Sequence, residues 1–301
     1  MKKAILSLCI AAMTAASLTL PASAADLMTF RFGAEKTAVS TDELAKGDVV
    51  IPGGLYIDNY TGIAQLRMIL RSTEPILIEN GRYTPDPNGA LDDDGLVRDA
   101  FFEKHSTHFY TQKSEIDDDT NIILWAGEET EKAGEFHANG VVRNANSSFL
   151  SFDYRIPKDT RPGDYSCYVS ERVITNSIGV PEEELRISDS KHQLKLGEEF
   201  ALRPLTISVY MRGDANCDGK VEIEDAQAAL VLYTEQEVTG QELSNEDLAG
   251  ILKTKSIAAG KLGVDASQDG SIDVTDPQGI LDYYVRSMIG SAPAWSEIYK
   301  K

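Results

Sequence analysis

The sequence predicts a multi-domain protein with two domains of different class, an all-β antiparallel sandwich followed by a small all-α domain. Short segments of alternating polarity, separated by Pro, Gly and Asp, fill the chain up to about residue 211. Beyond residue 211, two similar twelve-residue loops are each followed by apolar residues at helical spacing. Regular short strands are typical of a sandwich, whereas a period of 3.6 residues indicates helices.

The N-terminus has the three regions of a secretory signal peptide. Lys2 and Lys3 provide the positive charge, an apolar run extends from residue 4 to about 20, and Ala22-Ser23-Ala24 is a small-residue cleavage site. The run is too short and broken to favour a permanent membrane span. We therefore expect a secreted, extracellular protein that reaches a cell surface only through a partner. The expected divisions are a signal peptide at 1–24, the sandwich at 25–211, and the helical domain with its C-terminal tail at 212–301.

Alternation and β-branched or aromatic residues predict the strands of the first domain. The segments concerned are 63–71, 121–126, 149–156, 164–169 and 205–210. Pro52-Gly53-Gly54 and residues 161–164 predict turns, and residues 88–119, with two runs of three Asp, predict a long loop. No linker rich in Pro, Thr, Gly or Ser precedes the first twelve-residue loop, so we expect the two domains to be closely packed or joined semi-rigidly.

The twelve-residue loops, 214–225 and 265–276, have the spacing of a calcium site. Each has an oxygen-bearing side chain at places 1, 3, 5, 9 and 12 and glycine at place 6, which is Gly219 or Gly270. Ca²⁺ takes six to eight oxygen ligands, and glycine permits the sharp turn around the ion. Clustered carboxylates repel one another until a cation neutralises them, so we expect two structural Ca²⁺ ions.

The loops depart from an EF-hand at two points. Place 12 is Asp, in Asp225 and in Asp276, and the residues that enter the first loop predict a strand. A loop followed by a helix, occurring twice, resembles a dockerin, a family in which two loop–helix units fold around two Ca²⁺ ions and bind a cohesin. The resemblance implies these ligands: Asp214, Asn216, Asp218, Lys220 through its carbonyl, Glu222 and Asp225, then Asp265, Ser267, Asp269, Ser271 through its carbonyl, Asp273 and Asp276.

The same resemblance implies a docking surface at loop places 10 and 11 and on the helix that follows each loop. The residues at these positions are Ile223, Glu224, Val231 and Leu232 in the first copy, and Val274, Thr275, Asp282 and Tyr283 in the second. The copies differ there, which disfavours two interchangeable docking orientations. The alternative for the apolar members is that they face the small core of the domain.

Parts of the first domain resemble a cohesin, the module that receives a dockerin. The similar stretches are 61–66, 121–125 with Gly140, and 148–165. This resemblance implies a dockerin-binding sheet face around residues 65–71 and 122–128. The alternative is another secreted β-sandwich, such as a carbohydrate-binding module or an immunoglobulin-like spacer.

Composition and motifs narrow the function. A net charge of −19 argues against nucleic acid and anionic membranes as partners, because both need a basic surface. Cys167 and Cys217 remain after signal removal and are expected to be free thiols, with a bridge between them as the alternative. The sequence has no nucleophile elbow, glycine-rich phosphate loop or Cys/His metal cluster, so we expect no enzyme.

These observations predict a non-catalytic adaptor scaffoldin of a cellulosome-type, polysaccharide-degrading complex. Its sandwich would bind a dockerin-bearing protein, and its own dockerin would bind a cohesin of a larger scaffoldin. The alternative is a dockerin-bearing carbohydrate-binding protein or a small polysaccharide-degrading enzyme.

Overall fold

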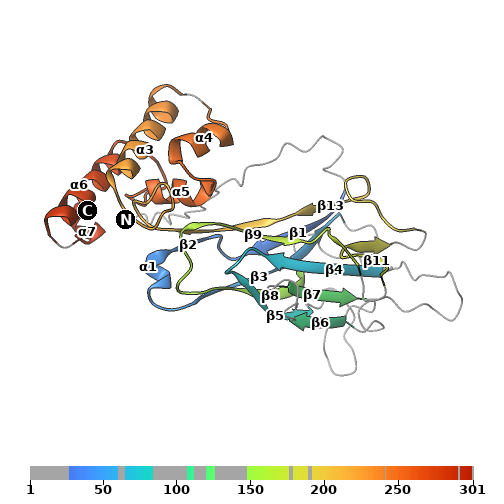
Figure 1. The fold of residues 1–301 in the computed structure, drawn as a ribbon. Coiled ribbons are helices and arrows are strands. Elements are labelled where there is room, and N and C mark those ends of the chain that lie inside the picture. Colours follow the sequence, from blue (N-terminus) through green and yellow to red (C-terminus); the bar gives the residue numbers. More distant parts are fainter. Residues whose placement is uncertain are drawn as a thin grey trace, which may run out of the picture.

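The computed structural model describes residues 27–59, 65–83, 107–111, 120–125, 148–175, 179–188, 192–240, 242–290 and 292–299. Strands lie between residues 28 and 210, and the helices other than α1 (Thr41–Leu44) follow from residue 223 (Figure 1). The expected signal peptide lies outside the described residues. Within the described ranges, no helix has the length and apolar character needed to cross a membrane.

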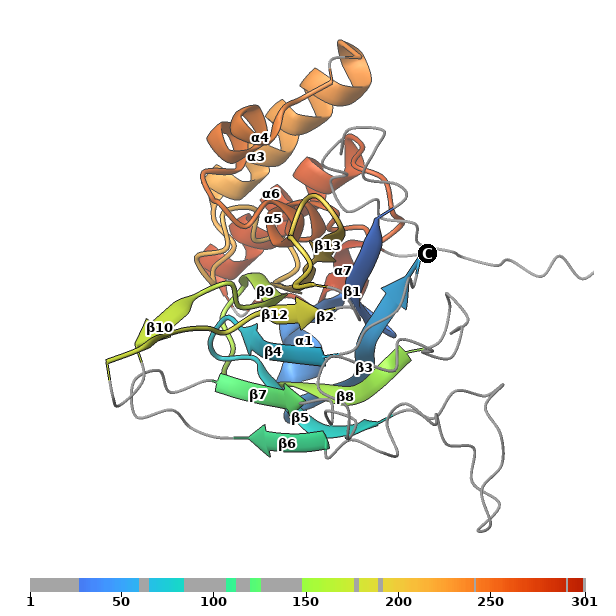
Figure 2. The ribbon, with the colours of Figure 1, turned by 90° about the vertical axis from the view of Figure 1, so that its right-hand side faces the viewer.

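Most strands belong to two sheets that face each other (Figures 1 and 2). The first sheet has the order β13 (Phe200–Arg203), β1 (Met28–Ala34), β3 (Val49–Asp58), β8 (Ser148–Ile156) and β5 (Leu77–Tyr83). The second has the order β2 (Ala38–Ser40), β14 (Leu205–Tyr210), β9 (Gly163–Val169), β4 (Gln65–Ser72), β7 (Thr120–Trp125) and β6 (Thr107–Thr111), with β12 (Arg186–Ser188) also paired to β4. A separate pair joins β10 (Val173–Thr175) and β11 (Pro181–Glu183).

Two edge pairs correct the prediction of an antiparallel sandwich. β1 pairs with β13 in parallel, and β2 pairs with β14 in parallel. The reason is topological: the first two strands lie in different sheets, and each meets one of the two strands that close the sandwich much later in the chain. The other strand pairs of the described residues are antiparallel.

A cluster of buried hydrophobic side chains from the described strands fills the space between the two sheets. Phe30, Phe152 and Tyr154 from the first sheet pack in the same cluster as Met68 and Ile207 from the second, and each is at most 2% exposed. The rings of Phe152 and Tyr154 meet edge to face at 5.2 Å. Because burying one such side chain contributes roughly 1.5–3 kcal/mol, this shared core holds the two sheets together.

The predicted strands correspond to β4, β7, β8, β9 and β14, although residues 63 and 64 lie outside the described part. The turn predicted at Pro52-Gly53-Gly54 is wrong, because these residues lie inside β3. A Cβ at Gly53 would overlap the ring of Tyr154, so this glycine provides room for the core. The long loop predicted at 88–119 is interrupted by β6, which pairs with β7, and its remaining residues lie outside the described ranges.

The helical domain has a core of its own. It contains α3 (Ile223–Tyr233), a π-helical turn η2 (Thr234–Val238), α4 (Asn245–Leu252), α5 (Ile257–Val264), α6 (Thr275–Ile289) and α7 (Trp295–Ile298). The helices after both loops, predicted from sequence, are confirmed as α3 and α6, and these two pack against each other. Ala229, Leu252, Val264 and Ile280 are fully buried in the core. Ser244 caps α4 as predicted, in a capping box with Asp247.

One residue of the sandwich caps a helix of the other domain. Asp164, on β9, accepts hydrogen bonds at 2.9 Å from the backbone N–H groups of Ala258 and Ala259, in the first turn of α5. Its own N–H donates to Ser256 Oγ at 3.0 Å, and Ser208 Oγ on β14 donates to its carboxylate at 2.7 Å. Ser256 occupies the N-cap position but makes no side-chain cap within α5. The close packing of the two domains predicted from the missing linker is therefore confirmed.

Replacing Asp164 with Ala removes both acceptors from the first turn of α5. We expect the helical domain to lose about 1–2 kcal/mol of unfolding free energy, the usual cost of losing an N-cap. Urea unfolding of the full chain, followed by far-UV circular dichroism, measures this loss. Asp159→Ala removes an exposed carboxylate from the connection between β8 and β9 and is the control. Equal changes in the two variants would show that the cap contributes nothing.

Candidate metal centres and docking surface

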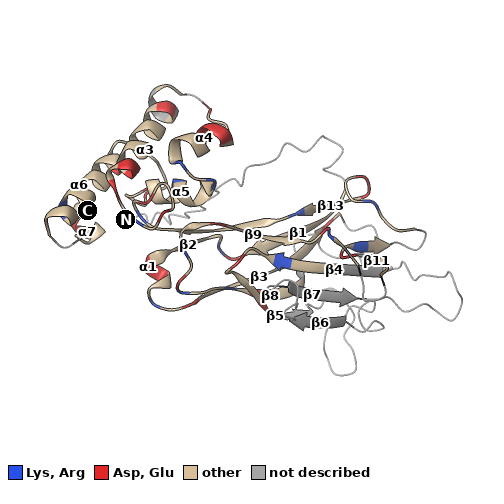
Figure 3. Ribbon diagram, in the orientation of Figure 1, with Lys and Arg blue, Asp and Glu red and all other residues tan. Residues whose placement is uncertain are grey.

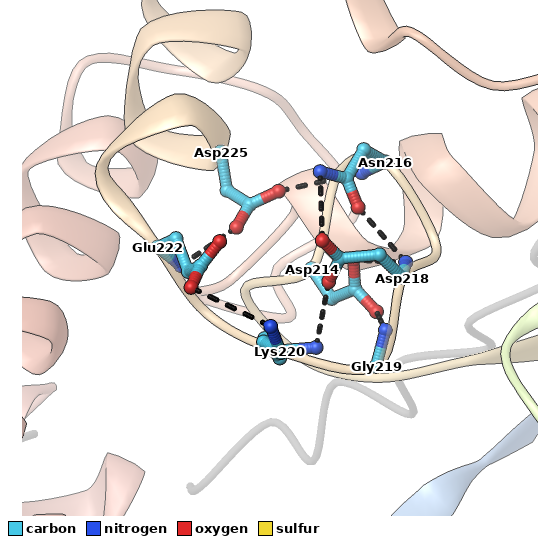
Figure 4. Close-up of polar contacts among 7 residues, drawn as sticks. All are labelled: Asp214, Asn216, Asp218, Gly219, Lys220, Glu222 and Asp225. Carbon is cyan, nitrogen blue, oxygen red and sulfur yellow. Dashed lines mark hydrogen bonds and ion pairs between the residues drawn. The ribbon is translucent and has the colours of Figure 1, made fainter.

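The first twelve-residue loop begins a few residues after β14, and its carboxylates turn towards its own backbone (Figure 4). Asp214 accepts hydrogen bonds from the N–H groups of Asp218 at 3.2 Å and Gly219 at 2.8 Å. Asp225 accepts from the N–H groups at places 3 and 9 of the loop, at 3.4 and 2.7 Å. The carboxylates at places 1 and 12 thus hold the loop closed from both ends.

The second loop repeats this arrangement. Asp265 accepts from the N–H groups at places 5 and 6, at 3.2 and 3.0 Å, and Asp276 accepts from those at places 3 and 9, at 2.8 and 2.9 Å. The φ angles agree as well: place 4 has 62° in the first loop and 60° in the second, and place 6 has 86° and 87°. Positive φ at place 6 is the reason that both loops have glycine there. The sequence repeat is therefore a repeat of backbone conformation.

Three carboxylates of the loops are fully buried, those of Asp214, Asp225 and Asp276. Burial, reinforced by the negative charges of Asp225 and Asp218, raises the pKa of Asp214 to about 6. Burial likewise raises the pKa of Asp225 and of Asp276. None of the ion pairs among the described residues involves these three groups. A buried carboxylate without a cationic partner is costly, and such groups normally pair or coordinate a metal.

Three of the predicted carboxylate ligands of the first loop lie close together, whereas the fourth, Glu222, lies apart from them at the surface. The negative charge of Asp218 raises the pKa of Asp214 and of Asp225, so these three side chains lie close together, and Asn216 Oδ1 accepts from the N–H of Asp218 at 2.8 Å. The Glu222 side chain, 44% exposed, faces outward and lies 3.9 Å from Lys220 Nζ.

In the second loop, Ser267 Oγ donates to Asp265 at 3.3 Å, and Asp269 accepts from the N–H of Ser271 at 2.9 Å. Asp273 is turned to the start of α6 instead, where it accepts from the N–H and hydroxyl of Thr275 at 2.7 and 2.6 Å. These bonds lower the pKa of Asp273.

The donor set of each loop fits a hard cation by its chemistry, since every predicted ligand offers oxygen. Among the described residues, however, no three His, Cys, Asp or Glu side chains gather into a cluster that would hold a metal. Acidic side chains alone therefore do not complete either site. The first would also need the Asn216 amide and the Lys220 carbonyl, and the second would need Ser267 and the Ser271 carbonyl.

Most of the predicted docking residues of the first copy are on the surface. Ile223 is 40% and Val231 45% exposed, and Glu224 is also exposed. Leu232 is the exception, because its side chain is fully buried in the core of the helical domain. The prediction of Leu232 as a partner-binding residue is therefore wrong. The alternative, that the apolar members face the core of the domain, is correct for Leu232.

In the second copy, Val274 is 41% exposed and Thr275 is exposed at the start of α6. Asp282 forms an ion pair with Arg286 at 2.7 Å. The ring of Tyr283 stacks on Trp295 with 4.3 Å between centroids, so the chain's own tail covers one side of it. The two copies thus present different surfaces, in residue type and in accessibility.

The C-terminal tail folds back over the start of the first loop. Trp295 lies between Tyr283 and the guanidinium of Arg212, which is 4.9 Å from the Trp295 ring centroid. Tyr299 lies on the same guanidinium at 5.1 Å, and its hydroxyl donates to the carbonyl of Thr275 at 3.2 Å. A Cβ at Gly213 would come within 2.7 Å of the Trp295 ring. The tail therefore joins the beginning of the helical domain to its last long helix.

Both cysteines are free, as predicted. The Sγ of Cys217 lies 3.9 Å from the carbonyl oxygen of Ser256, at the start of α5. Burial raises the pKa of Cys167 and of Cys217 to about 12 in each case. Neither thiol is activated at neutral pH.

Sequence reasoning missed the glycines of α5. A Cβ at Gly260 would lie 2.6 Å from the carbonyl oxygen of Ala215, and one at Gly263 would overlap the carbonyl of Asp214. The N–H of Gly213 donates to Gly263 O at 2.8 Å. Gly260 and Gly263, three residues apart in an apolar segment, could have predicted that α5 lies very close to another part of the backbone, here the first loop.

Comparisons with known proteins return structural neighbours only. No protein-family model and no curated protein matches the sequence. Among solved structures, the seventh ScaB type I cohesin from Pseudobacteroides cellulosolvens has 13% identity and a TM-score of 0.35, over 62% of this chain and 93% of that one. A type III cohesin from the ScaE scaffoldin of Ruminococcus flavefaciens has 15% identity and a TM-score of 0.33, over 64% and 92%. A type II cohesin from Acetivibrio cellulolyticus has 9% identity and a TM-score of 0.30, over 60% and 95%.

Replacing Trp295 with Ala removes both its stack on Tyr283 and its contact with Arg212. We expect the helical domain to lose at least about 1 kcal/mol of unfolding free energy, the size of an aromatic pair together with a cation–π contact. The midpoint of thermal unfolding of the full chain reports this loss. Glu297→Ala, at an exposed position of α7, is the control. An unchanged midpoint for Trp295→Ala would mean that the tail does not stabilise the domain.

Proposed function

We propose that this chain is a secreted, non-catalytic adaptor scaffoldin. Its sandwich acts as a cohesin-like module that receives a dockerin-bearing protein, and its helical domain acts as a dockerin that binds a cohesin of a larger scaffoldin. Together they extend a polysaccharide-degrading complex. One observation supports the proposal most strongly. Two loops with the same backbone conformation and with buried carboxylates follow a two-sheet sandwich in the chain.

The calcium part of the proposal rests on charge. Asp214 and Asp225 are both 0% exposed in the same loop, and Asp276 is 0% exposed in the other. A cation bound at each loop would neutralise carboxylates whose pKa values are raised by burial. Two Ca²⁺ ions, held by the oxygen donors predicted above, are therefore proposed as structural elements of the dockerin.

The sandwich part of the proposal rests on architecture and on the resemblance of its segments to a cohesin. The two segments named as a candidate docking face belong to neighbouring strands, since β4 and β7 pair from Leu66–Trp125 to Arg71–Thr120. They would therefore form one continuous sheet surface. A sheet face of this kind can bind a partner without any catalytic group.

Replacing Asp214 and Asp265 together with Ala removes the place 1 carboxylate from both loops. We expect calcium-dependent helicity to be lost, with far-UV circular dichroism of the variant in calcium resembling that of the wild type in EDTA. Glu198→Ala with Glu297→Ala removes the same charge at exposed positions and is the control. Full helicity of the Asp variant, and of the wild type in EDTA, would disprove the structural role of calcium.

The same Asp214→Ala, Asp265→Ala variant separates the two ends of the proposed adaptor. In the full chain it should abolish binding to any cohesin that the wild type binds, while binding of a dockerin from a panel to the sandwich persists. Surface plasmon resonance in calcium measures both. If the wild type binds no dockerin but is retained on polysaccharide or hydrolyses it, the carbohydrate-binding or enzyme alternative replaces the adaptor.

A further inference from the structure

The helical domain has a groove between α3 and α4, with a volume of about 680 Å³. One face of each helix forms its walls, since the lining residues recur at intervals of three and four. The walls are Glu224, Gln227, Ala228, Val231 and Glu235 on α3 and the adjoining turn, and Glu246, Asp247, Gly250 and Ile251 on α4, with Leu243 and Lys253 at the two ends of α4. The opposite face of α4 is occupied, because Leu248 and Leu252 are buried in the core.

The lining of the groove combines apolar side chains with negative charge. Val231 is 45% exposed, and Leu243 and Ile251 are half-buried beside it. Four carboxylates, Glu224, Glu235, Glu246 and Asp247, line the groove with a single cationic residue, Lys253. Figure 3 shows the acidic segments on α3 and α4. An apolar segment would bury surface here, and the rim would favour one that carries positive charge.

The groove lies beside the helix of the first loop–helix copy. α4 lies in the segment between the two loops, and α6 is followed instead by α7 and the tail that covers Tyr283. Val231 and Glu224, predicted docking residues of the first copy, are part of the groove lining, whereas in the second copy the tail residues Trp295 and Tyr299 contact Tyr283 and Thr275. The groove is therefore a structural difference between the two otherwise similar copies.

We propose that this groove is a docking site for a partner segment that presents an apolar side chain flanked by Lys or Arg. The inference rests on the proposed function and deepens it, because the groove adjoins the docking surface of the first copy. An apolar side chain would lie against Val231, Leu243 and Ile251, and its basic neighbours would meet the carboxylates of the rim. Acidic segments would be repelled, so the groove would also select against wrong partners.

The chain offers a matched pair of variants for testing the groove. Gly250 lines the groove, and a Cβ placed on it meets no atom within 4 Å. Gly250→Trp should therefore fill the groove without disturbing the core, and Gly250→Ala is the control at the same position. Glu235→Lys with Glu246→Lys reverses charge on both walls, and Glu198→Lys, at a 68% exposed position of the sandwich, is its control.

The probe is a random peptide library displayed on phage, selected against the calcium-loaded full chain. We expect selected peptides rich in Lys or Arg beside Leu, Ile or Phe. Gly250→Trp and the double Glu→Lys variant should each weaken their binding at least about tenfold, a change of about 1.4 kcal/mol. Both controls should bind as the wild type does.

Three outcomes overturn the inference: no peptide is selected, the selected peptides are acidic, or the peptides bind Gly250→Trp as tightly as Gly250→Ala. Failure here is distinguishable from failure of the proposed function. A chain that binds a cohesin but no basic peptide refutes only the groove, and one that binds such peptides at the groove but no cohesin or dockerin refutes only the adaptor.

Discussion

The burial of Asp214 and Asp225 in one short loop is the constraint on which the rest of the structure depends. Both side chains are 0% exposed, and removing an ion from water costs several kcal/mol unless it is compensated. Backbone N–H groups provide part of that compensation and give the loop its shape. A cation bound at the loop would neutralise the remaining negative charge, so in the proposed function the folding of the helical domain would depend on metal binding.

That loop is also where the parts of the molecule meet. The loop follows closely on β14, Gly263 of α5 packs on the carbonyl of Asp214, and the tail closes over Gly213. Asp164 then ties the first turn of α5 to β9. A cation bound at the first loop would therefore also brace the junction between the domains. In the proposed adaptor, such a junction would fix the direction in which one partner is held relative to the other.

Periodicity identified the repeated or long elements, but not the contacts between distant parts of the chain. Loop spacing located Asp214 and Asp265 with their helices, and alternation located β8 and β14. Gly53 was predicted to lie in a turn because glycine favours turns locally. Its packing against the Tyr154 ring, about a hundred residues further along the chain, cannot be predicted from local propensity. Leu232 was predicted to be a surface residue from its position in the family pattern. That pattern does not show how α3 packs in this domain, where the Leu232 side chain is buried in the core. Asp164 was assigned to a strand, but its capping of a helix more than ninety residues away depends on tertiary structure.

Isothermal titration of Ca²⁺ into the EDTA-stripped full chain tests the central claim most directly. We expect two bound ions per chain, with far-UV circular dichroism gaining helical signal as they bind. Asp214→Ala should abolish the first-loop ion while the Asp265 loop still binds its own. A chain that takes up no calcium and has its full helical signal in EDTA would disprove the structural role of calcium, because the buried carboxylates would then be stable without a cation.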